Sequence, residues 1–491
     1  MPVPTGTVGP VQLAPMLGPW RSAGGGRSKP LQTVLAERVS SLILDGRLAL
    51  GARLPAERSL SEALGVSRTT VSAAYAQLRE SGFAVSRQGS GSYTALPGHV
   101  SARAGGGWDA GRGEMPDVID LMTAAPTAPL PELREAVHRA ADLLPEFGGS
   151  GGYQPYGLTR LREAVADRYS RRGLPTSPGQ ILITNGAQGA ITLVARLLCR
   201  AGDRILVEGP TYPNALDTFR AAQARPIPVP MDVDGWAPRA YENALAQLTP
   251  RLAYLIPHFQ SPTGHLMDPA RQAAVAHAAR RAGSWLLADE TITDVALDVP
   301  VPPPFAAGIR PADAEAVLVC GSMAKSFWGG LRIGWLRGPE RIVHELAAAR
   351  AAMDLASPIL DQLTAALLLD RADAHASWQR ERLREQRAAL MQAVDRTFPA
   401  WTYRVPEGGL CLWLRMDKEE ATSLSRRAQT HGVLVHSGPR FGADAGTFER
   451  FIRLPYSLPS HSLLEAVRRL ALARESRGPR PAADHRDDLV A

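Results

Sequence analysis

The chain has 491 residues, of which 45% are hydrophobic and 21% charged, a length that predicts roughly three domains with a large buried core. It has no run close to the roughly 20 apolar residues of a membrane span and no N-terminal signal-peptide pattern, so a membrane or secreted protein is not expected. Three scattered cysteines, Cys199, Cys320 and Cys411, show no metal-binding spacing and fit a reducing cytoplasm.

Positive charge is concentrated near the start of the chain. The formal net charge is +7, and residues 1–95 contain ten Lys or Arg against five Asp or Glu. A basic N-terminal segment is typical of proteins that bind nucleic acid, although charge alone does not establish that function. Residues 1–30, rich in Pro and Gly without a period, predict a flexible leader.

Residues 31–95 predict a compact unit dominated by helices. Within LPAERSLSEALGVSRTTVSAAYAQLRESGF, residues 54–83, two short helices flank a turn at Gly65, and Ser67 is placed to cap the second helix. Helical spacing turns a set of apolar residues toward the core: Leu60, Ala63, Leu64, Val71, Ala74 and Leu78. The exposed start of the second helix is then left to Arg68, Thr69, Thr70 and Ser72. In a helix-turn-helix this end enters the major groove of DNA.

FAVSRQGSGSYT, residues 83–94, alternates apolar and polar residues around two glycines and predicts a two-stranded wing. A small helical module that binds protein is the alternative interpretation of this unit. The segment resembles the winged helix-turn-helix of the GntR superfamily through G-x-x-L-P-x-x-R at 51–58, L-G-V-S-R-T-T-V at 64–71 and R-Q-G-S-G-S-Y at 87–93. The resemblance implies DNA contacts from Arg58, Ser67, Arg68, Thr69 and Thr70, and from Gln88 and Gly89 at the wing tip.

Residues 96–117, rich in Gly and small polar residues, predict a linker. From 118 to 474 apolar strands alternate with amphipathic helices, which predicts an α/β domain with a mainly parallel sheet covered on both faces. The expected strands are ILIT at 181–184, RILVE at 204–208, LAYLIP at 252–257, SWLLAD at 284–289, AVLVCGS at 316–322 and RIGWL at 332–336. Residues 475–491 are polar and predict a disordered tail.

Lys325 stands out because the chain has only two other lysines, Lys29 and Lys418, and otherwise uses arginine. An amine can lose its proton and attack a carbonyl, whereas a guanidinium stays protonated and is a poor nucleophile. The pattern therefore favours a lysine that forms a Schiff base. A surface lysine that escaped the arginine bias is the alternative.

The surroundings of Lys325 suit pyridoxal 5′-phosphate (PLP). Arg332 and Ser322 can hold its phosphate, together with backbone N–H groups of NGAQ, residues 185–188, where a strand gives way to a helix. Asp289 suits the pyridine nitrogen, which needs a carboxylate to stay protonated, and Tyr212 suits stacking on the ring. These residues follow strand ends, where α/β sheets place ligands, although each alone is more often a turn, a cap or a packing residue.

Residues 120–474 resemble the fold-type I aminotransferases. The matching motifs are Y-x-P-x-G-L (153–158), N-G-A-Q (185–188), P-T-Y-P (210–213), Q-S-P-T-G (260–264), D-E-T (289–291), S-x-x-K (322–325), G-L-R-I-G-W (330–335) and R-L-P-Y (453–456). The resemblance implies a smaller C-terminal α+β subdomain from about residue 355. It makes Lys325 the Schiff-base residue, with Asp289 on the pyridine nitrogen and Tyr212 on the ring. The phosphate would be held by Ser322, Arg332, Ala187 and Gln188, Tyr153 would reach over from the partner subunit, and Arg453 would bind an amino-acid carboxylate.

Two positions depart from the family pattern. Many members have Asn where this chain has Ser261 and Tyr where it has Thr291, and both family side chains bond the phenolic oxygen of the cofactor. The shorter Ser and Thr argue mildly against an efficient enzyme.

The fusion of the two units, residues 31–474, resembles the MocR/GabR-type transcriptional regulators. The resemblance implies a head-to-tail homodimer that binds a promoter with two half-sites and senses PLP, an amino acid or their adduct. Such sensing needs only unequal ligand affinity for two conformations. A working aminotransferase with a secondary DNA-binding unit is one alternative, and a repressor that binds its effector without a covalent cofactor is another. Lys325 and its partner residues argue against the second.

Overall fold

A computed structural model describes residues 8–17, 30–44, 48, 51–87, 91–95, 117–232, 234–444 and 446–476. The chain divides into two compact units, Met1–Glu114 and Met115–Ala491, and each is described here by itself. Most of the predicted linker, the predicted wing tip at Gln88 and Gly89, and residues 477–491 of the predicted tail lie outside the described residues.

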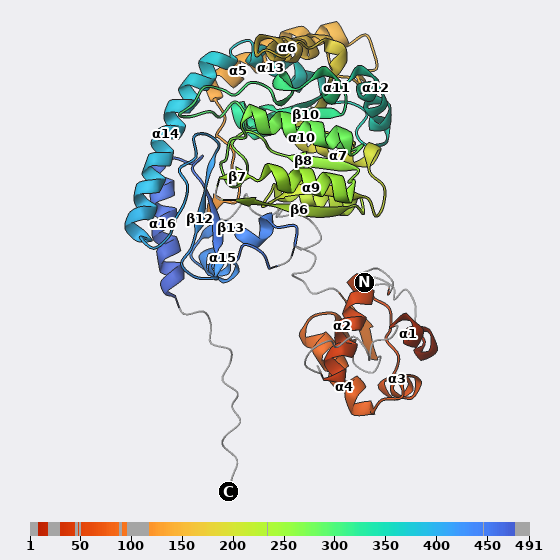
Figure 1. The fold of residues 1–491 in the computed structure, drawn as a ribbon. Helices are drawn as coiled ribbons and strands as arrows, with labels where there is room; N and C mark the ends of the chain where they lie inside the picture. The colour runs from red at the N-terminus through yellow and green to blue at the C-terminus, as the bar shows by residue number, and fades with distance from the viewer. Residues whose placement is uncertain are drawn as a thin grey trace. The chain divides into compact units, whose positions relative to one another are not determined.

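The N-terminal unit is the predicted winged helix-turn-helix (Figure 1). Its elements are α1 (Pro10–Met16), α2 (Leu31–Leu44), α3 (Glu57–Leu64), α4 (Arg68–Glu80), β1 (Ala84–Arg87) and β2 (Gly91–Thr94), the two strands pairing antiparallel. The turn forms because Gly65 adopts a φ of 60°, a left-handed conformation that costs glycine little. Ser67 then caps α4 by accepting a hydrogen bond of 3.1 Å from the backbone N–H of Thr70.

The core of this unit is built from the helix faces that the sequence predicts, with one exception. Leu60, Val71, Ala74 and Leu78 are buried, whereas Ala63 is exposed. The prediction for Ala63 is wrong because α3 has only eight residues and its buried stripe is narrow.

The predicted flexible leader is wrong for residues 8–17. Pro10 occupies the first turn of α1, where its missing N–H has no partner to lose, and Leu13 and Leu17 lie four residues apart and are buried in the N-terminal core. The backbone N–H of Val8 also donates to the carbonyl oxygen of Arg53 at 3.0 Å. A seven-residue helix has too few apolar positions to stand out from a Pro- and Gly-rich background.

The large unit is built on a sheet of eight strands in the order β4-β11-β10-β9-β8-β5-β6-β7. The strands are β4 (Ile181–Asn185), β5 (Arg204–Gly209), β6 (Arg225–Asp232), β7 (Gly235–Trp236), β8 (Leu252–Leu255), β9 (Trp285–Asp289), β10 (Val317–Ser322) and β11 (Ile333–Arg337). Neighbours from β10 to β6 run parallel, while β11 is antiparallel to β10 and β4, and β7 is antiparallel to β6. The mainly parallel sheet and its six expected strands are confirmed.

The sequence does not predict β6, because Pro226, Pro228 and Pro230 argue against a strand inside a sheet. These prolines alternate, so the missing N–H groups all point away from β5. The residues between them keep their N–H groups for the parallel pairing with β5.

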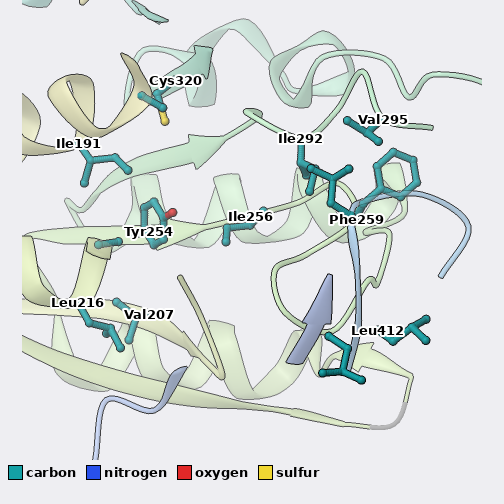
Figure 2. Packing of buried hydrophobic residues seen from close by; sticks show 14 of the residues in the cluster. Ile191, Val207, Leu216, Tyr254, Ile256, Phe259, Ile292, Val295, Cys320 and Leu412 are labelled. Carbon is teal, nitrogen blue, oxygen red and sulfur yellow. The ribbon is translucent and has the colours of Figure 1, made fainter. Parts of the chain in front are cut away.

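Helices cover both faces of this sheet (Figure 1). They are α5 (Leu130–Leu143), α6 (Thr159–Arg171), α7 (Gly186–Leu198), α8 (Pro213–Ala221), α9 (Pro238–Leu248), α10 (Pro269–Arg281), α11 (Pro311–Ala314), α12 (Glu340–Ala349) and α13 (Ile359–Leu369). Successive strand residues alternate between two buried clusters: Val207 belongs to one and Leu206 to the other. Figure 2 shows part of the first cluster, with Val207, Tyr254 and Cys320 among its buried side chains.

The smaller subdomain differs from the predicted one in where it starts and in containing a strand from an earlier part of the chain. Its sheet has the order β12 (Cys411–Arg415), β14 (Phe451–Pro455), β13 (Val433–Ser437), β3 (Ile119–Leu121), and it is accompanied by α14 (Ala372–Thr397), α15 (Ala421–Thr430) and α16 (Ser460–Glu475). The predicted start near 355 is wrong, because α13 packs into the core of the large sheet. β3, which comes before the large sheet in the chain, pairs parallel with β13. Within the described parts of the chain, no helix combines the length and apolarity needed to cross a membrane.

Candidate functional site

The carboxyl ends of the strands bring the predicted cofactor residues to one edge of the main sheet. Asn185, Asp289 and Ser322 are the last residues of β4, β9 and β10. These three strands run in the same direction, because β11 is antiparallel to both β4 and β10. Ligands of open α/β sheets bind at this edge.

Lys325 lies in a π-helical turn, η6 (Ala324–Trp328), directly after β10. Its Nζ donates a hydrogen bond of 2.6 Å to the carbonyl oxygen of Ala124. Burial, and then the positive charge of nearby Arg453, lower the pKa of Lys325 to about 8 against the opposing effect of Asp289. The site therefore raises the fraction of neutral amine at neutral pH, which is the form that attacks a carbonyl.

The predicted phosphate-binding turn lies where β4 passes into α7. Gly186 has a φ of 69°, and a Cβ there would lie 2.6 Å from Nη2 of Arg332, so the close approach of the guanidinium requires glycine. Nη2 of Arg332 donates to the carbonyl oxygen of Asn185 at 3.2 Å. The first N–H groups of α7, from Gly186, Ala187 and Gln188, have no partner within the helix. The guanidinium and these N–H groups form a cradle for an anion.

Two of the predicted phosphate ligands also have other contacts. Ser322 Oγ donates to the carbonyl oxygen of Ile333 at 3.2 Å and accepts from the N–H of Ala324 at 3.1 Å. Its hydroxyl must turn away from Ile333 to bind a phosphate oxygen, because it has one hydrogen to donate. The side chain of Gln188 donates to Thr218 Oγ1 at 2.6 Å, which leaves its backbone N–H for the cradle.

The carboxylate of Asp289 is fixed by two hydrogen bonds. Oδ1 accepts from the N–H of Thr291 at 2.9 Å, and Oδ2 accepts from the hydroxyl of Tyr254 at 2.8 Å. Tyr212 precedes α8 and accepts at its hydroxyl from Asn214 at 3.0 Å, and burial followed by the charge of Asp289 raises its pKa. Tyr254 is a partner that the sequence did not indicate, since it reads as an ordinary core residue of β8.

Arg453 is a buried cation on β14, with 6% of the residue exposed. Nη2 donates to the carbonyl oxygen of Met122, and the guanidinium lies 5.2 Å from the ring centre of Phe441. Burial lowers the pKa of Arg453. A buried guanidinium that keeps an N–H without a partner is suited to a carboxylate ligand.

Unpartnered atoms test whether the residues present fit PLP. Two buried groups near Lys325 and Asp289 that can donate have no hydrogen-bond partner among the described residues: Thr291 Oγ1 and Arg453 Nε. Buried polar groups are normally satisfied, so these atoms indicate a polar ligand. An anion cradle, a fixed carboxylate and an amine of lowered pKa are the groups that PLP requires, so the residues fit it. Ser261 is half-buried on the loop after β8.

Tyr153 is not brought into the site of its own chain. It lies on the loop between α5 and α6 and is 67% exposed. Within one chain, the candidate site is therefore formed without the side chain of Tyr153.

A buried network that the sequence did not indicate contacts the candidate phosphate-binding turn. Arg350 is 1% exposed, and its Nη1 donates to the carbonyl oxygens of Ile183 at 2.6 Å and Pro155 at 3.1 Å. Its Nε pairs with Asp354 Oδ1 at 2.6 Å, and Asp354 Oδ2 accepts from Nδ2 of Asn185 at 2.5 Å. The network joins the turn to the loop that carries Tyr153. No short motif signals it, because its members come from three distant segments.

The predicted DNA-contact residues gather at the start of α4 and on α3. The Oγ of Ser67 lies 2.7 Å from Thr69 Oγ1 and 2.8 Å from Thr70 Oγ1, so three hydroxyls sit together over the N-terminus of α4. The side chains of Arg58 and Arg68 are 82% and 72% exposed and form only exposed or long ion pairs, Arg58 with Glu62 at 3.1 Å and Arg68 with Glu57 at 3.8 Å. Such pairs hold little energy, so both guanidinium groups are available to a phosphate or base.

Comparison with known proteins gives two family matches that divide the chain as the two units do. Residues 116–470 match the aminotransferase class I and II family, and residues 31–93 match the bacterial regulatory proteins of the gntR family. The uncharacterized HTH-type transcriptional regulator YisV of Bacillus subtilis is 30% identical over 461 residues, which cover 89% of this chain and 94% of YisV. The probable rhizopine catabolism regulatory protein MocR of Rhizobium meliloti is 28% identical, over 85% of this chain and 90% of MocR.

Aminotransferases are also among the similar proteins. The 2-aminoadipate transaminase of Thermus thermophilus is 32% identical over 72% of this chain and 90% of the enzyme. The crystal structure of LysN, an α-aminoadipate aminotransferase from the same organism complexed with N-(5′-phosphopyridoxyl)-L-leucine, superposes with a TM-score of 0.69 at 28% identity. It covers 77% of this chain and 96% of LysN.

Proposed function

We infer the function of this chain from its membership: it belongs to the aminotransferase class I and II family and, through its GntR-type N-terminal unit, to the MocR-type transcriptional regulators. It is a DNA-binding regulator whose aminotransferase-like domain binds PLP. We propose that PLP, or its combination with an amino acid, changes the affinity of the regulator for its promoter. The observation that carries the proposal is that one chain holds both the exposed arginines of α3 and α4 and the group of polar side chains around Lys325.

Each residue of the pocket has a separate role in this proposal. Bound PLP supplies an electrophilic carbonyl and an electron-withdrawing ring. Lys325 provides the amine that binds it covalently, Arg332 and the start of α7 bind its phosphate, and Asp289 holds the proton on its ring nitrogen. Ser322 gives the phosphate a further donor once its hydroxyl turns. Tyr212 covers the ring, and Ser261 and Thr291 offer hydroxyls near its phenolic oxygen.

The proposed effector is an amino acid bound through its carboxylate. Arg453 supports this, because its Nε is buried and has no partner within the described residues, and a carboxylate is the ligand that satisfies it. The carbonyl oxygen of Met122, which now accepts from Nη2, would have to share or give up that donor. If Met122 gives up that donor, the segment around it is released, and such a movement is a route by which the site can change conformation.

We also propose a homodimer in which Tyr153 enters the partner's site. The support is a group of large apolar side chains exposed on α5 and the segment after it: Leu130, Val137, Leu144 and Tyr153. Exposed apolar groups of this kind mark interaction surfaces. A head-to-tail dimer carries two DNA-binding units, so its promoter contains two half-sites.

A transaminase with an accessory DNA-binding unit is the second candidate, favoured by the complete set of Lys325, Asp289, Arg332 and Arg453. The regulator accounts for more of the chain, since YisV matches 89% of it and the transaminase 72%.

The deciding experiment measures promoter binding by the full-length protein without PLP, with PLP, and with PLP plus each of a panel of amino acids. Transamination is assayed in the same preparations. We expect DNA affinity to change several-fold, in line with a coupling free energy of about 1–3 kcal/mol, with little turnover. The variant Arg453→Met should lose the response to amino acids and keep the response to PLP. Vigorous turnover, with DNA affinity indifferent to every ligand, would favour the transaminase instead.

A further inference from the structure

Glu208, at the end of β5, is a carboxyl group with no exposed surface and no place in any motif considered above. Its Oε1 accepts hydrogen bonds from Nε1 of Trp236 at 2.7 Å and the N–H of Ile256 at 3.0 Å. Its Oε2 accepts from Nε2 of Gln260 at 2.9 Å and the hydroxyl of Thr211 at 3.4 Å. All four partners are neutral. A buried carboxyl group without a positive partner is costly unless its hydrogen bonds are satisfied.

The two oxygens of Glu208 serve different parts of the molecule. Oε1 joins the edge strand β7 to the end of β8, through Trp236 and Ile256. Oε2 joins two loops of the cofactor site, because Thr211 precedes Tyr212 and Gln260 precedes Ser261.

Gln260 extends this second connection on both sides. Its Nε2 also donates to the carbonyl oxygen of Pro210 at 2.8 Å, and its Oε1 accepts from the N–H and the hydroxyl of Thr263 at 3.1 and 2.7 Å. The loop of residues 209–212 and the loop of residues 260–264 are thus tied together through one pair of side chains.

We propose that Glu208 is a positioning residue for the cofactor: through Oε2 and Gln260 it fixes the loop of Tyr212 relative to the loop of Ser261. This inference rests on the proposed function, in which those two side chains meet the ring and the phenolic oxygen of PLP. Without the hydrogen bond between Glu208 and Gln260 the two loops remain folded, but the distance between the ring of Tyr212 and the hydroxyl of Ser261 is no longer fixed.

The geometry also says why glutamate, and not glutamine, occupies this position. Nε1 of Trp236 and the N–H of Ile256 can only donate, and Nε2 of Gln260 is an amide donor. A carboxylate accepts from all four partners, and a carboxylic acid can still accept from three of them and donate to Thr211 Oγ1. With its oxygen kept toward Trp236 and Ile256, a glutamine would turn its NH2 group toward Nε2 of Gln260, which is itself a donor, so that hydrogen bond is lost, whereas Thr211 Oγ1 can still accept. Burial raises the pKa of Glu208 to about 8, which is consistent with a carboxyl group retained for a purpose other than stability.

Three single variants of the full-length protein separate positioning from simple stabilisation. Glu208→Gln disturbs the carboxyl group itself, Gln260→Met removes the connection on the Oε2 side, and Trp236→Phe removes a hydrogen bond of similar length on the Oε1 side. For each, the measurements are the affinity for PLP by titration, the visible absorption band of bound PLP, and the thermal midpoint of the cofactor-free protein.

We expect Trp236→Phe to lower the thermal midpoint and to leave the PLP affinity and the absorption band unchanged. Gln260→Met and Glu208→Gln should weaken PLP binding about tenfold, the effect of losing one hydrogen bond, and shift the band.

Two results would overturn the inference. One is that Glu208→Gln and Gln260→Met bind PLP with wild-type affinity and an unshifted band. The other is that all three variants lose affinity in proportion to their loss of thermal midpoint, which would make Glu208 a structural residue only. Should Glu208→Gln not fold, Gln260→Met and Thr211→Val give the same decision. A wild-type protein that takes up no PLP would overturn the cofactor assignment together with this inference, whereas unaffected variants of a PLP-binding wild type would overturn this inference alone.

Discussion

The DNA-binding unit carries its candidate arginines on the surface, whereas the large unit buries the arginine proposed to bind the effector. The side chains of Arg58 and Arg68 are 82% and 72% exposed, while only 6% of Arg453 is exposed. DNA is a long polyanion that meets the protein from outside, so an arginine that contacts it remains hydrated until DNA arrives. A small carboxylate can be surrounded, and the arginine that binds it is desolvated in advance.

The two units also differ in the hydrogen bonds and ion pairs that their charged side chains make before a ligand binds. The exposed arginines need no acceptor in the fold, and their ion pairs with Glu57 and Glu62 are easily given up. Around Lys325, by contrast, backbone carbonyls of Met122 and Ala124 accept from Arg453 and Lys325. The large unit must therefore exchange internal hydrogen bonds for ligand contacts, and a conformational response to ligand follows most directly there.

The largest effect is expected from Lys325→Ala, which tests whether the amine of Lys325 is the covalent attachment point. The variant should lose covalent PLP completely and keep its fold, because Arg332 and the start of α7 still bind phosphate. Borohydride reduction of the loaded protein, followed by peptide mapping, locates the modified residue. Lys418→Ala is the matched control and should be modified like the wild type. Modification at Lys29 or Lys418, or at no lysine, would show that Lys325 is not the reactive amine.

The sequence predicts the cofactor residues that lie next to strand ends, because the order of strand and helix already determines which edge of the sheet they share. Asp289, Ser322 and Asn185 are placed in this way, and each needs only its own strand to be recognised. The candidate DNA-contact residues are predictable for a related reason, since helical spacing alone separates exposed Arg68 from buried Val71.

The contacts that hold these residues in place could not be predicted, because each joins segments far apart in the chain. Gln260 is 52 residues from Glu208, and Ile183 is 167 residues from Arg350. Short apolar elements were missed for a different reason. β3 has three residues and α1 has seven, too few for a period to emerge, and both are held by tertiary packing.

The next largest effect should come from the DNA-binding unit. If Arg58 and Arg68 each contribute a factor of about ten, as good base contacts do, the double variant Arg58→Ala, Arg68→Ala loses about a hundredfold in promoter affinity. Its affinity should also depend less steeply on salt, because fewer counterions are released. Gel-shift titrations at several salt concentrations measure both quantities.

Arg280→Ala, Arg281→Ala is the control for this loss of charge, because it removes the same two charges from exposed positions on the large unit. It should bind DNA within a few-fold of the wild type. The comparison between the units also requires that the Arg58, Arg68 variant bind PLP normally. Wild-type promoter affinity in that variant would mean that the start of α4 does not contact DNA.

The smallest effect is a pH dependence that only the buried site should show. With a pKa of about 8, Lys325 is mostly charged below that pH and mostly neutral above it. The attacking form is the neutral amine, so the rate of covalent PLP attachment should rise about tenfold between roughly pH 7 and pH 9, as the titration of a single group requires. The phosphate of PLP does not cause this rise, because its second pKa is about 6 and it stays ionised throughout.

Arg453→Gln removes the nearby positive charge that lowers the pKa of Lys325, so the midpoint of the rate profile should move to higher pH. The proposed DNA contacts rest on guanidinium groups, a type of side chain that does not lose its proton in proteins, so promoter affinity of the cofactor-free protein should be flat. Stopped-flow absorbance gives the attachment rates. A rate that does not change with pH would contradict the distinction between a desolvated amine in one unit and hydrated arginines in the other. So would a promoter affinity that changes with pH in the same way as the rate.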